Sequence, residues 1–276
     1  MKKYITDEII EKEMIKRVAA TFIIVSCVLL ILLYMFQEKI IFPTEQLDKD
    51  FVFSFAQKFE EVNLKTNDGE TINALHFKVP NPKGIILFFH GNKGNLSRWG
   101  NLVSYLETYQ YDVFVMDYRN YGKSSGSFDE KEMYKDALLA YDHVKQQYPE
   151  NQIVVYGRSL GCTFATRVAT QNNPKHLVLE APFYNMKKGV RFYSKLAPTF
   201  IIKYKFRTDL DIPKVKTPIT FFHGDADKTT SFEQSKELFQ LVTSKQKEFV
   251  FYFEEQQTHS MQWKPLPGVF ALPSFS

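Results

Sequence analysis

The stretch IVVYGRSLGCTFA, from Ile153 to Ala165, decides the fold class of this chain. A run of β-branched residues stops at Gly157, a serine follows at position 159, and beyond Gly161 small and apolar residues recur at helical spacing. We interpret this pattern as a buried strand that turns directly into a helix. The glycines are expected because strand and helix must approach closely, and because Ser159 must adopt a strained backbone conformation at the corner.

Strands and helices alternate on both sides of this corner. Two alternating runs, FEEVNLKT and TINALHFKV, are joined by NDG and predict a β-hairpin. Further strands are predicted at residues 84–89, 111–117, 153–156, 176–180, 219–223 and 248–253. Helices are predicted at residues 96–109, 133–148, 160–171 and 231–241, whereas residues 182–213 read as an irregular aromatic and basic insert. The order predicts an α/β fold with a mostly parallel central sheet and helices on both faces.

The N-terminal segment reads as a membrane anchor. Residues 18–36 carry no charge over 19 positions, which at about 1.5 Å per residue is enough to cross a hydrocarbon core of about 30 Å. A cleaved signal peptide fits less well, because the apolar run is longer than usual and no small-residue cleavage pattern follows it. Basic residues gather before the run, at Lys2, Lys3, Lys12, Lys16 and Arg17, and only Lys39 and Lys49 follow closely. This bias predicts a cytoplasmic N-terminus and a catalytic domain on the non-cytoplasmic side.

We therefore expect one large domain behind an anchor. The expected division is a cytoplasmic segment at 1–17, the anchor at 18–36, a linker at 37–58, an α/β domain at 59–263 with a lid insert at about 183–212, and an irregular tail at 264–276. The 276 residues carry a net charge of only +4, which gives no reason to expect nucleic acid as a partner. The two cysteines, Cys27 and Cys162, imply no disulfide framework.

A serine hydroxyl needs a base that is itself held by a third group. In this strand–serine–helix arrangement the acid and the histidine follow the serine, which leaves His176, His223 and His259 as candidates. His259 lies in a loop just after the last predicted strand, at the edge where Ser159 is expected, and is the preferred base. His176 opens a strand and so lies at the opposite edge, whereas His223 precedes a glycine in a place that is more often structural.

The acid is expected in the loop HGDAD, where Asp227 is preferred and Asp225 remains the alternative. Either aspartate could instead form a turn, since Asp bonds its own backbone in tight loops. The oxyanion donors are expected to be the backbone N–H of Leu160, at the start of the helix, and that of Asn92 in the loop HGNKGN.

Four motifs, HGNKGN, DYRNYGKSSG, GRSLG and HGDAD, resemble in order and spacing the α/β-hydrolase superfamily. They are most similar to its membrane-anchored or membrane-associated ABHD-type serine hydrolases, which include depalmitoylases. The resemblance covers about 36–259 and implies Ser159 as nucleophile, Asp227 as acid, His259 as base, and Asn92 and Leu160 as oxyanion donors. It implies neither a metal nor an organic cofactor. The tail QQTHSMQWKPLPGVFALPSFS departs from the family, which usually has glycines before the histidine and a closing helix.

The expected activity is cleavage of carboxylic ester or thioester bonds in acyl-lipid or acyl-protein substrates through an acyl-enzyme. Two alternatives stay open: a serine peptidase on the same fold, and a catalytically impaired, membrane-tethered binding protein, which the unusual tail suggests. The insert carries seven cations and no acid from 187 to 207, with aromatic residues between them. It is interpreted either as a lid that lies on anionic membrane lipids or as a lid whose cations are simply solvated.

Overall fold

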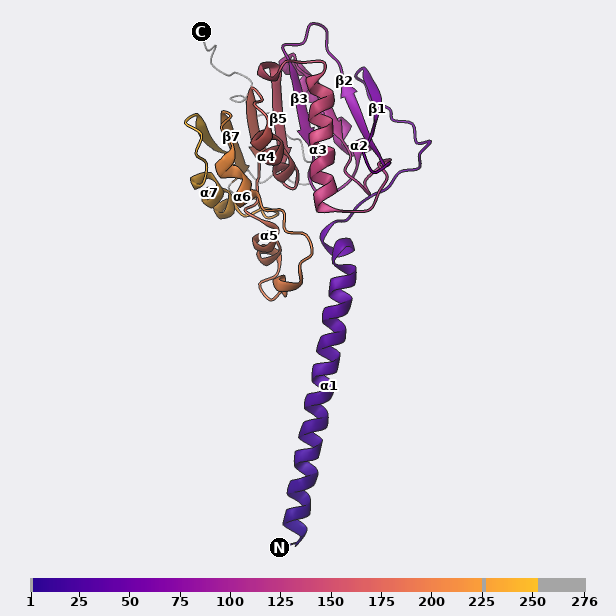
Figure 1. Ribbon diagram of the computed structural model, residues 1–276, viewed down its shortest axis with the longest axis vertical. Coiled ribbons are helices and arrows are strands. Elements are labelled where there is room, and N and C mark those ends of the chain that lie inside the picture. Colours follow the sequence, from indigo (N-terminus) through magenta and orange to yellow (C-terminus); the bar gives the residue numbers. More distant parts are fainter. Residues whose placement is uncertain (1, 225–226, 253–276) are drawn as a thin grey trace.

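A long N-terminal helix stands out from a layered α/β body in the computed structural model, which describes residues 2–224 and 227–252 (Figure 1). This helix, α1, runs from Lys2 to Ile41 and so extends beyond the expected anchor at both ends. Within the described residues it is the one helix long and apolar enough to cross a membrane, with a mean hydropathy of 2.7 in its most apolar window. Its large apolar side chains are exposed, as for Phe22 at 72%. The helix is therefore no core helix, and its length and composition fit a membrane anchor or a signal sequence.

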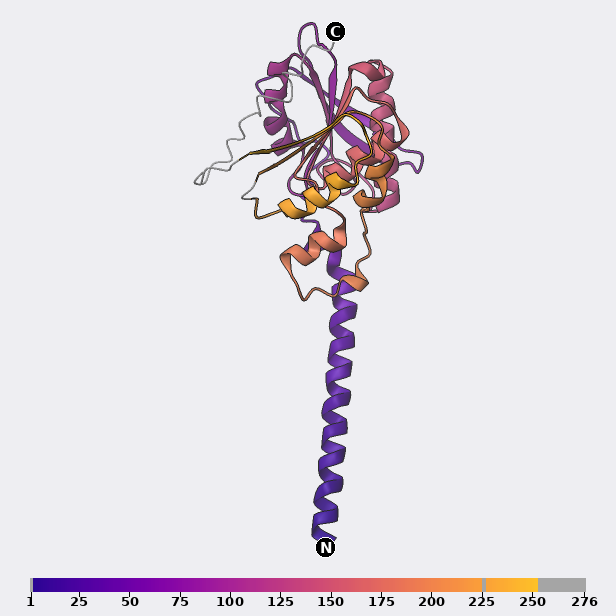
Figure 2. The same cartoon turned by 90° about the vertical axis from the view of Figure 1, so that its left-hand side faces the viewer.

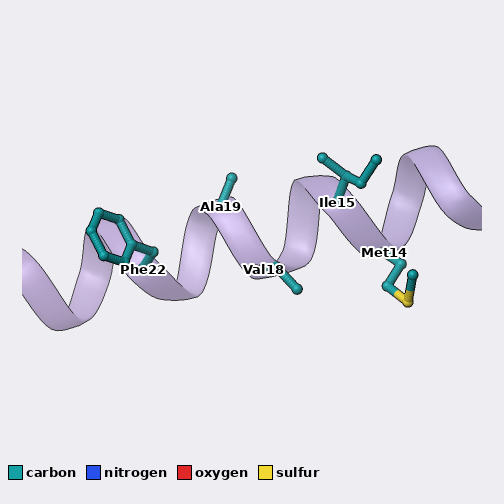
Figure 3. Close-up of a pocket in the computed structure, with 5 residues that line it drawn as sticks. All are labelled: Met14, Ile15, Val18, Ala19 and Phe22. Carbon is teal, nitrogen blue, oxygen red and sulfur yellow. The ribbon is translucent and has the colours of Figure 1, made fainter.

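A shallow hollow on α1 has an entirely apolar lining (Figure 3). The hollow is lined by Met14, Ile15, Val18, Ala19 and Phe22. All five belong to one helix, and none offers a polar group that could orient a substrate. This surface suits lipid chains rather than chemistry.

The body is built on an eight-stranded sheet, whose order among the described residues is β1-β2-β4-β3-β5-β6-β7-β8. The strands are β1 (Phe59–Lys65), β2 (Thr71–Phe77), β3 (Ile85–Phe89), β4 (Asp112–Met116), β5 (Ile153–Arg158), β6 (His176–Glu180), β7 (Ile219–Gly224) and β8 (Lys247–Tyr252). The predicted hairpin is confirmed, since β1 and β2 pair antiparallel, as do β2 and β4. All other neighbours pair parallel, which confirms the predicted mostly parallel sheet.

Helices cover both faces of the sheet (Figure 2). The α-helices of the body are α2 (Leu96–Val103), α3 (Glu130–Lys145), α4 (Gly161–Gln171), α5 (Met186–Tyr193), α6 (Thr208–Asp211) and α7 (Phe232–Gln240). The 3-10 turns are η1 (Ser104–Tyr109), η2 (Glu150–Gln152), η3 (Thr199–Ile201) and η4 (Ile212–Lys214). Leu96 and Trp99 of α2 pack in the cluster on one face, and residues of α3, α4 and α7 pack in the larger cluster on the other.

The insert at 182–213 is more regular than predicted, because it contains α5 and α6. The Asn185 side chain caps α5 by accepting a hydrogen bond of 3.0 Å from the Lys188 amide. The sequence interpretation was wrong here because the mixture of cations and aromatics hides this cap. Phe206 is fully buried and attaches the end of the insert to the core.

The corner between β5 and α4 leaves no room for side chains on its glycines. A Cβ at Gly161 would overlap the carbonyl oxygen of Phe89 and lie 2.8 Å from that of His90. A Cβ at Gly157 would lie 2.6 Å from both the Cys162 Cα and the Gly161 carbonyl oxygen. Since all of these neighbours are backbone atoms, no side-chain movement could make room.

We expect the substitution Gly161→Ala to lower the free energy of unfolding by at least about 2 kcal/mol, because the new methyl group forces β3 and α4 apart. Urea unfolding followed by circular dichroism in detergent micelles measures this change. Gly189→Ala in α5 is the matched control, since its Cβ would meet nothing closer than 3.9 Å and alanine favours helices. Equal losses in both variants would contradict the steric argument.

Candidate active site

Ser159 occupies the sharp turn between β5 and α4, with φ at +50°. A positive φ is uncommon for a residue with a Cβ and marks a strained position that its surroundings must hold. Its amide donates a 2.8 Å hydrogen bond to the Glu180 carbonyl of β6, and its own carbonyl accepts one of 3.0 Å from Cys162. The turn is thus fixed from the neighbouring strand and from the first turn of the helix. The half-buried Ser159 side chain is held at the carboxyl ends of the parallel strands.

Two backbone amides lie beside this turn without an acceptor. Leu160 precedes the first residue of α4, and Asn92 is in the loop that follows β3. Within the described part of the chain, neither N–H donates a hydrogen bond. The Asn92 loop lies against the corner, because a Cβ at Gly91 would be 3.7 Å from the Arg158 carbonyl oxygen. Free amides at a helix N-terminus and in an adjacent loop can stabilise a negatively charged oxygen.

A buried pair, His90 and Asp117, lies next to the start of the Asn92 loop. His90 and Asp117 are fully buried, with Nε2 of the histidine 3.2 Å from Oδ1 of the aspartate, although the two are not aligned as a hydrogen bond. The other ring nitrogen of His90 lies 2.7 Å from the Gly91 carbonyl, and the Tyr118 hydroxyl donates to the His90 carbonyl at 2.6 Å. Burial raises the pKa of Asp117, and the neighbouring His90 opposes that rise. These contacts of His90 hold the start of the loop in place.

Asp227 follows β7 at the same edge and forms a turn. Its Oδ1 accepts from the Thr229 amide at 2.6 Å, the Thr229 hydroxyl at 2.6 Å and the Thr230 amide at 3.0 Å. Its Oδ2 lies 3.6 Å from Nε2 of His223 and makes no hydrogen bond within the described residues. One carboxylate oxygen therefore orders the loop, and the other is left for a further partner. The alternative acid, Asp225, lies outside the described residues.

The preferred base, His259, also lies outside the described residues and stays a prediction. The other two candidates are engaged elsewhere. His223 is buried, with Nδ1 2.6 Å from the Ser235 hydroxyl and Nε2 3.0 Å from the Thr230 carbonyl. His176 lies at the first residue of β6, where Nε2 is 2.9 Å from the Thr220 hydroxyl. These contacts fit the structural role predicted for His223, and His176 lies at the start of its strand, at the opposite edge of the sheet, as predicted.

Sequence reasoning missed an ion pair that flanks the serine. Glu180 ends β6 and is 2% exposed, and its Oε1 lies 3.3 Å from Nε of Arg158, the residue before Ser159. The Tyr156 hydroxyl donates to its Oε2 at 2.8 Å. The strands pair Arg158 with Glu180 in register. The sequence signal for this ion pair was Glu180 itself, a carboxylate that directly follows the apolar residues LVL in the run HLVLE.

Known proteins resemble this chain in sequence and in fold. A family model described as serine aminopeptidase, S33, matches residues 80–210. The protein bem46 of Schizosaccharomyces pombe is 27% identical over 245 residues, covering 82% of this chain and 81% of its own. In structure, the Pyrococcus furiosus esterase Pf2001 matches 76% of this chain and 88% of its own, with a TM-score of 0.60 and 18% identity. The chain therefore has the α/β-hydrolase fold.

The proteins that the chain resembles include lipases. The lysophosphatidylserine lipase ABHD12 of Danio rerio is 28% identical over 181 residues, which are 57% of this chain and 47% of the lipase. The match thus spans about half of that enzyme. A soluble variant of the monoglyceride lipase of Saccharomyces cerevisiae shares the fold, with a TM-score of 0.54, 17% identity and coverage of 74% of this chain and 90% of its own. Lipases and esterases are thus among the proteins that this chain resembles in sequence or in fold.

We expect His176 to stay neutral at any pH where the protein works, because burial lowers its pKa to about 4. Between the unfolded pKa of about 6.5 and this value, only the unfolded chain binds the proton. The free energy of unfolding should therefore fall as the pH drops through this window, and His176→Gln should flatten that slope. Proton NMR of the ring in the full-length protein measures the pKa directly. Titration near 6.5 would contradict the burial argument.

Proposed function

We propose that this α/β-hydrolase is a single-pass, membrane-anchored enzyme that cleaves carboxylic ester or thioester bonds through an acyl-enzyme. The observation that carries the proposal is Ser159, held at φ +50° between β5 and α4, beside the acceptor-free amides of Leu160 and Asn92. A serine in a strained strand-to-helix turn, with candidate oxyanion donors at the helix N-terminus and in the adjacent loop, is the arrangement that acyl transfer requires.

In the proposed reaction the Ser159 hydroxyl attacks the acyl carbonyl as His259 removes its proton. Asp227 orients the imidazole and stabilises the imidazolium, and the two amides hold the oxyanion of the tetrahedral intermediate. Collapse expels the alcohol or thiol, which takes the proton from His259 and leaves the acyl group on Ser159. A water molecule, deprotonated by His259, then attacks the acyl-enzyme, releases the acid and restores the serine.

Retention of the N-terminal helix is part of the proposal. Gln37, within α1, is 7% exposed, and Phe42, just after it, is 1% exposed. A signal sequence that is removed has no reason to be packed into the domain. The excess of basic residues before the apolar run supports a cytoplasmic N-terminus and a catalytic domain on the other side of the membrane.

The substrate is proposed to be an acyl ester or thioester that is presented by a membrane. Two relatives act, by name, on lysophosphatidylserine and monoglyceride, which are lipid esters. In this chain, α5 and the residues after it lie beside the upper part of α1 (Figures 1 and 2). They expose Leu196 at 94% and Phe200 at 78%, next to the cations of the insert. Exposed apolar side chains in a segment that is rich in cations suit a surface that contacts anionic lipids.

The family model's description as a serine aminopeptidase favours a second candidate, peptide cleavage by the same groups. A peptidase would release amino acids from short peptides, whereas the proposed enzyme would turn over acyl esters or thioesters. A chain that neither reacts with a serine-directed probe nor cleaves any of these compounds would instead be a tethered binding protein.

We expect the wild-type protein in detergent micelles to be labelled by a fluorophosphonate probe and Ser159→Ala to lose the labelling completely, since only an activated serine reacts. Gel fluorescence reads the label, and a panel of acyl esters and thioesters of increasing chain length then ranks the substrates.

The matched control is Ser124→Ala, because Ser124 is a buried hydroxyl that donates to the Asp117 carbonyl at 2.9 Å, away from the strand-to-helix corner. It should keep its label. Equal labelling of wild type and Ser159→Ala would remove Ser159 from the mechanism.

We expect the double substitution Leu196→Asp/Phe200→Asp to lower hydrolysis of an ester carried in anionic vesicles by about tenfold or more, since two exposed apolar side chains lose their burial in lipid. Hydrolysis of a short water-soluble ester should be unchanged. Val52→Asp is the control, because Val52 is also exposed, at 81%, but lies between α1 and β1. A loss on both substrates would argue against a role of the lid in membrane contact.

A further inference from the structure

The last turn of α1 and the residue after it, 37–42, contact two separate parts of the candidate active site. We call this segment the anchor turn. One set of contacts reaches the Asn92 loop, and the other reaches the insert at 182–213. A helix that served only as a tether would need no such contacts, because a covalent link suffices to hold a domain at a membrane.

In the contact with the Asn92 loop, a side chain that is distant in the sequence caps the C-terminus of α1. Ile41 is the final residue of α1, so its carbonyl has no partner within the helix. The Asn92 side chain donates a 2.6 Å hydrogen bond to this carbonyl. On its other side, the Tyr121 hydroxyl donates to the Asn92 carbonyl at 2.9 Å and lies 3.0 Å from its Oδ1. The residue whose amide is a candidate oxyanion donor is thus held between the anchor and the domain.

The contact with the insert uses two neighbouring side chains of the anchor turn. Oε1 of Gln37 accepts a 2.7 Å hydrogen bond from the Lys203 amide, and its Nε2 donates to the Ile201 carbonyl at 3.3 Å. The carboxylate of Glu38 accepts from the Tyr204 hydroxyl at 2.7 Å. Since Gln37 is almost fully buried, these hydrogen bonds are shielded from water and fix the backbone of the insert.

Phe42, the last residue of the anchor turn, packs in the hydrophobic core of the domain. Its ring stacks on Phe128 at 4.2 Å between centroids and meets Tyr204 and Phe206 edge-on at 5.4 and 5.9 Å. All four rings are buried. The anchor turn is therefore part of the hydrophobic core of the domain.

We propose that the anchor turn is a positioning element of the active site, which sets the Asn92 amide through Ile41 and the lid through Gln37 and Glu38. This rests on the proposed function, and it makes catalysis depend on the end of the anchor even where no membrane is present. The two arms differ in their kinetic effect. Moving an oxyanion donor lowers kcat, whereas loosening the lid weakens substrate binding and raises KM.

The oxyanion arm is tested with the full-length protein in detergent micelles and a short water-soluble ester. Asn92→Ala removes the donor to Ile41, and we expect kcat to fall by about 10- to 100-fold with KM within twofold. Asn92→Asp keeps an acceptor for Tyr121 but also loses the donor. Similar losses in both variants would assign the effect to the missing hydrogen bond rather than to a new charge.

The lid arm is tested with Gln37→Ala, for which we expect KM to rise several-fold with kcat within about twofold. Gln37→Glu retains an acceptor for the Lys203 amide and should recover part of the loss. Hydrogen–deuterium exchange gives a readout independent of catalysis: the Lys203 amide should exchange at least about tenfold faster in Gln37→Ala.

Gln46→Ala is the matched control. Gln46 also joins the chain after α1 to the domain, by a 2.7 Å hydrogen bond to Asn120, but the contact is exposed. It should change neither the kinetic constants nor the exchange. Wild-type constants and wild-type exchange in both Asn92→Ala and Gln37→Ala would overturn the proposal. A wild-type protein that cleaves no ester would refute the proposed function, whereas faster exchange in Gln37→Ala would still show that the anchor turn holds the lid.

Discussion

The contact of the first residue of α4 with the backbone at the end of β3 is the constraint on which the rest of the structure depends. No side chain fits at Gly161, so helix and strand meet backbone to backbone. The loop with Asn92 begins where β3 ends, and the same contact therefore brings it beside the N-terminus of α4. A strained serine and two amides that donate to no acceptor among the described residues share one edge of the sheet as a result, and the candidate chemistry follows from this arrangement.

The N-terminal helix combines a long exposed apolar stretch with an end that is packed against the domain. Most of α1 exposes apolar side chains, which are costly in water and favourable in lipid. Its last turn is different, because Gln37 and Phe42 are buried against the body. The change from exposed to buried side chains occurs within a few residues, so the end of α1 is fixed against the domain. The orientation of the domain relative to α1 is then set by packing rather than by a flexible linker.

The regular elements were predictable because their signals are local. The apolar runs of the parallel strands and the helical pattern at 231–241 depend only on neighbouring residues, and the strands and α7 appear where these signals place them. Helix α5 was missed because its cap, Asn185, lies in a segment without a clear apolar period. Glu180 was missed because its partner Arg158 is brought to it only by strand pairing.

The sequence by itself determined the fold class, the serine corner and the apolar N-terminal helix, because each is written as a short pattern whose physics is local. It also restricted the candidate acid and base to a few positions after the serine. Among these, Asp227 lies in an ordered turn at the expected edge of the sheet. Only the tertiary structure decided that Ile41 caps on Asn92 and that Gln37 holds the insert. Those pairs lie 51 and 166 residues apart, and no local pattern encodes which distant polar groups a fold will bring together.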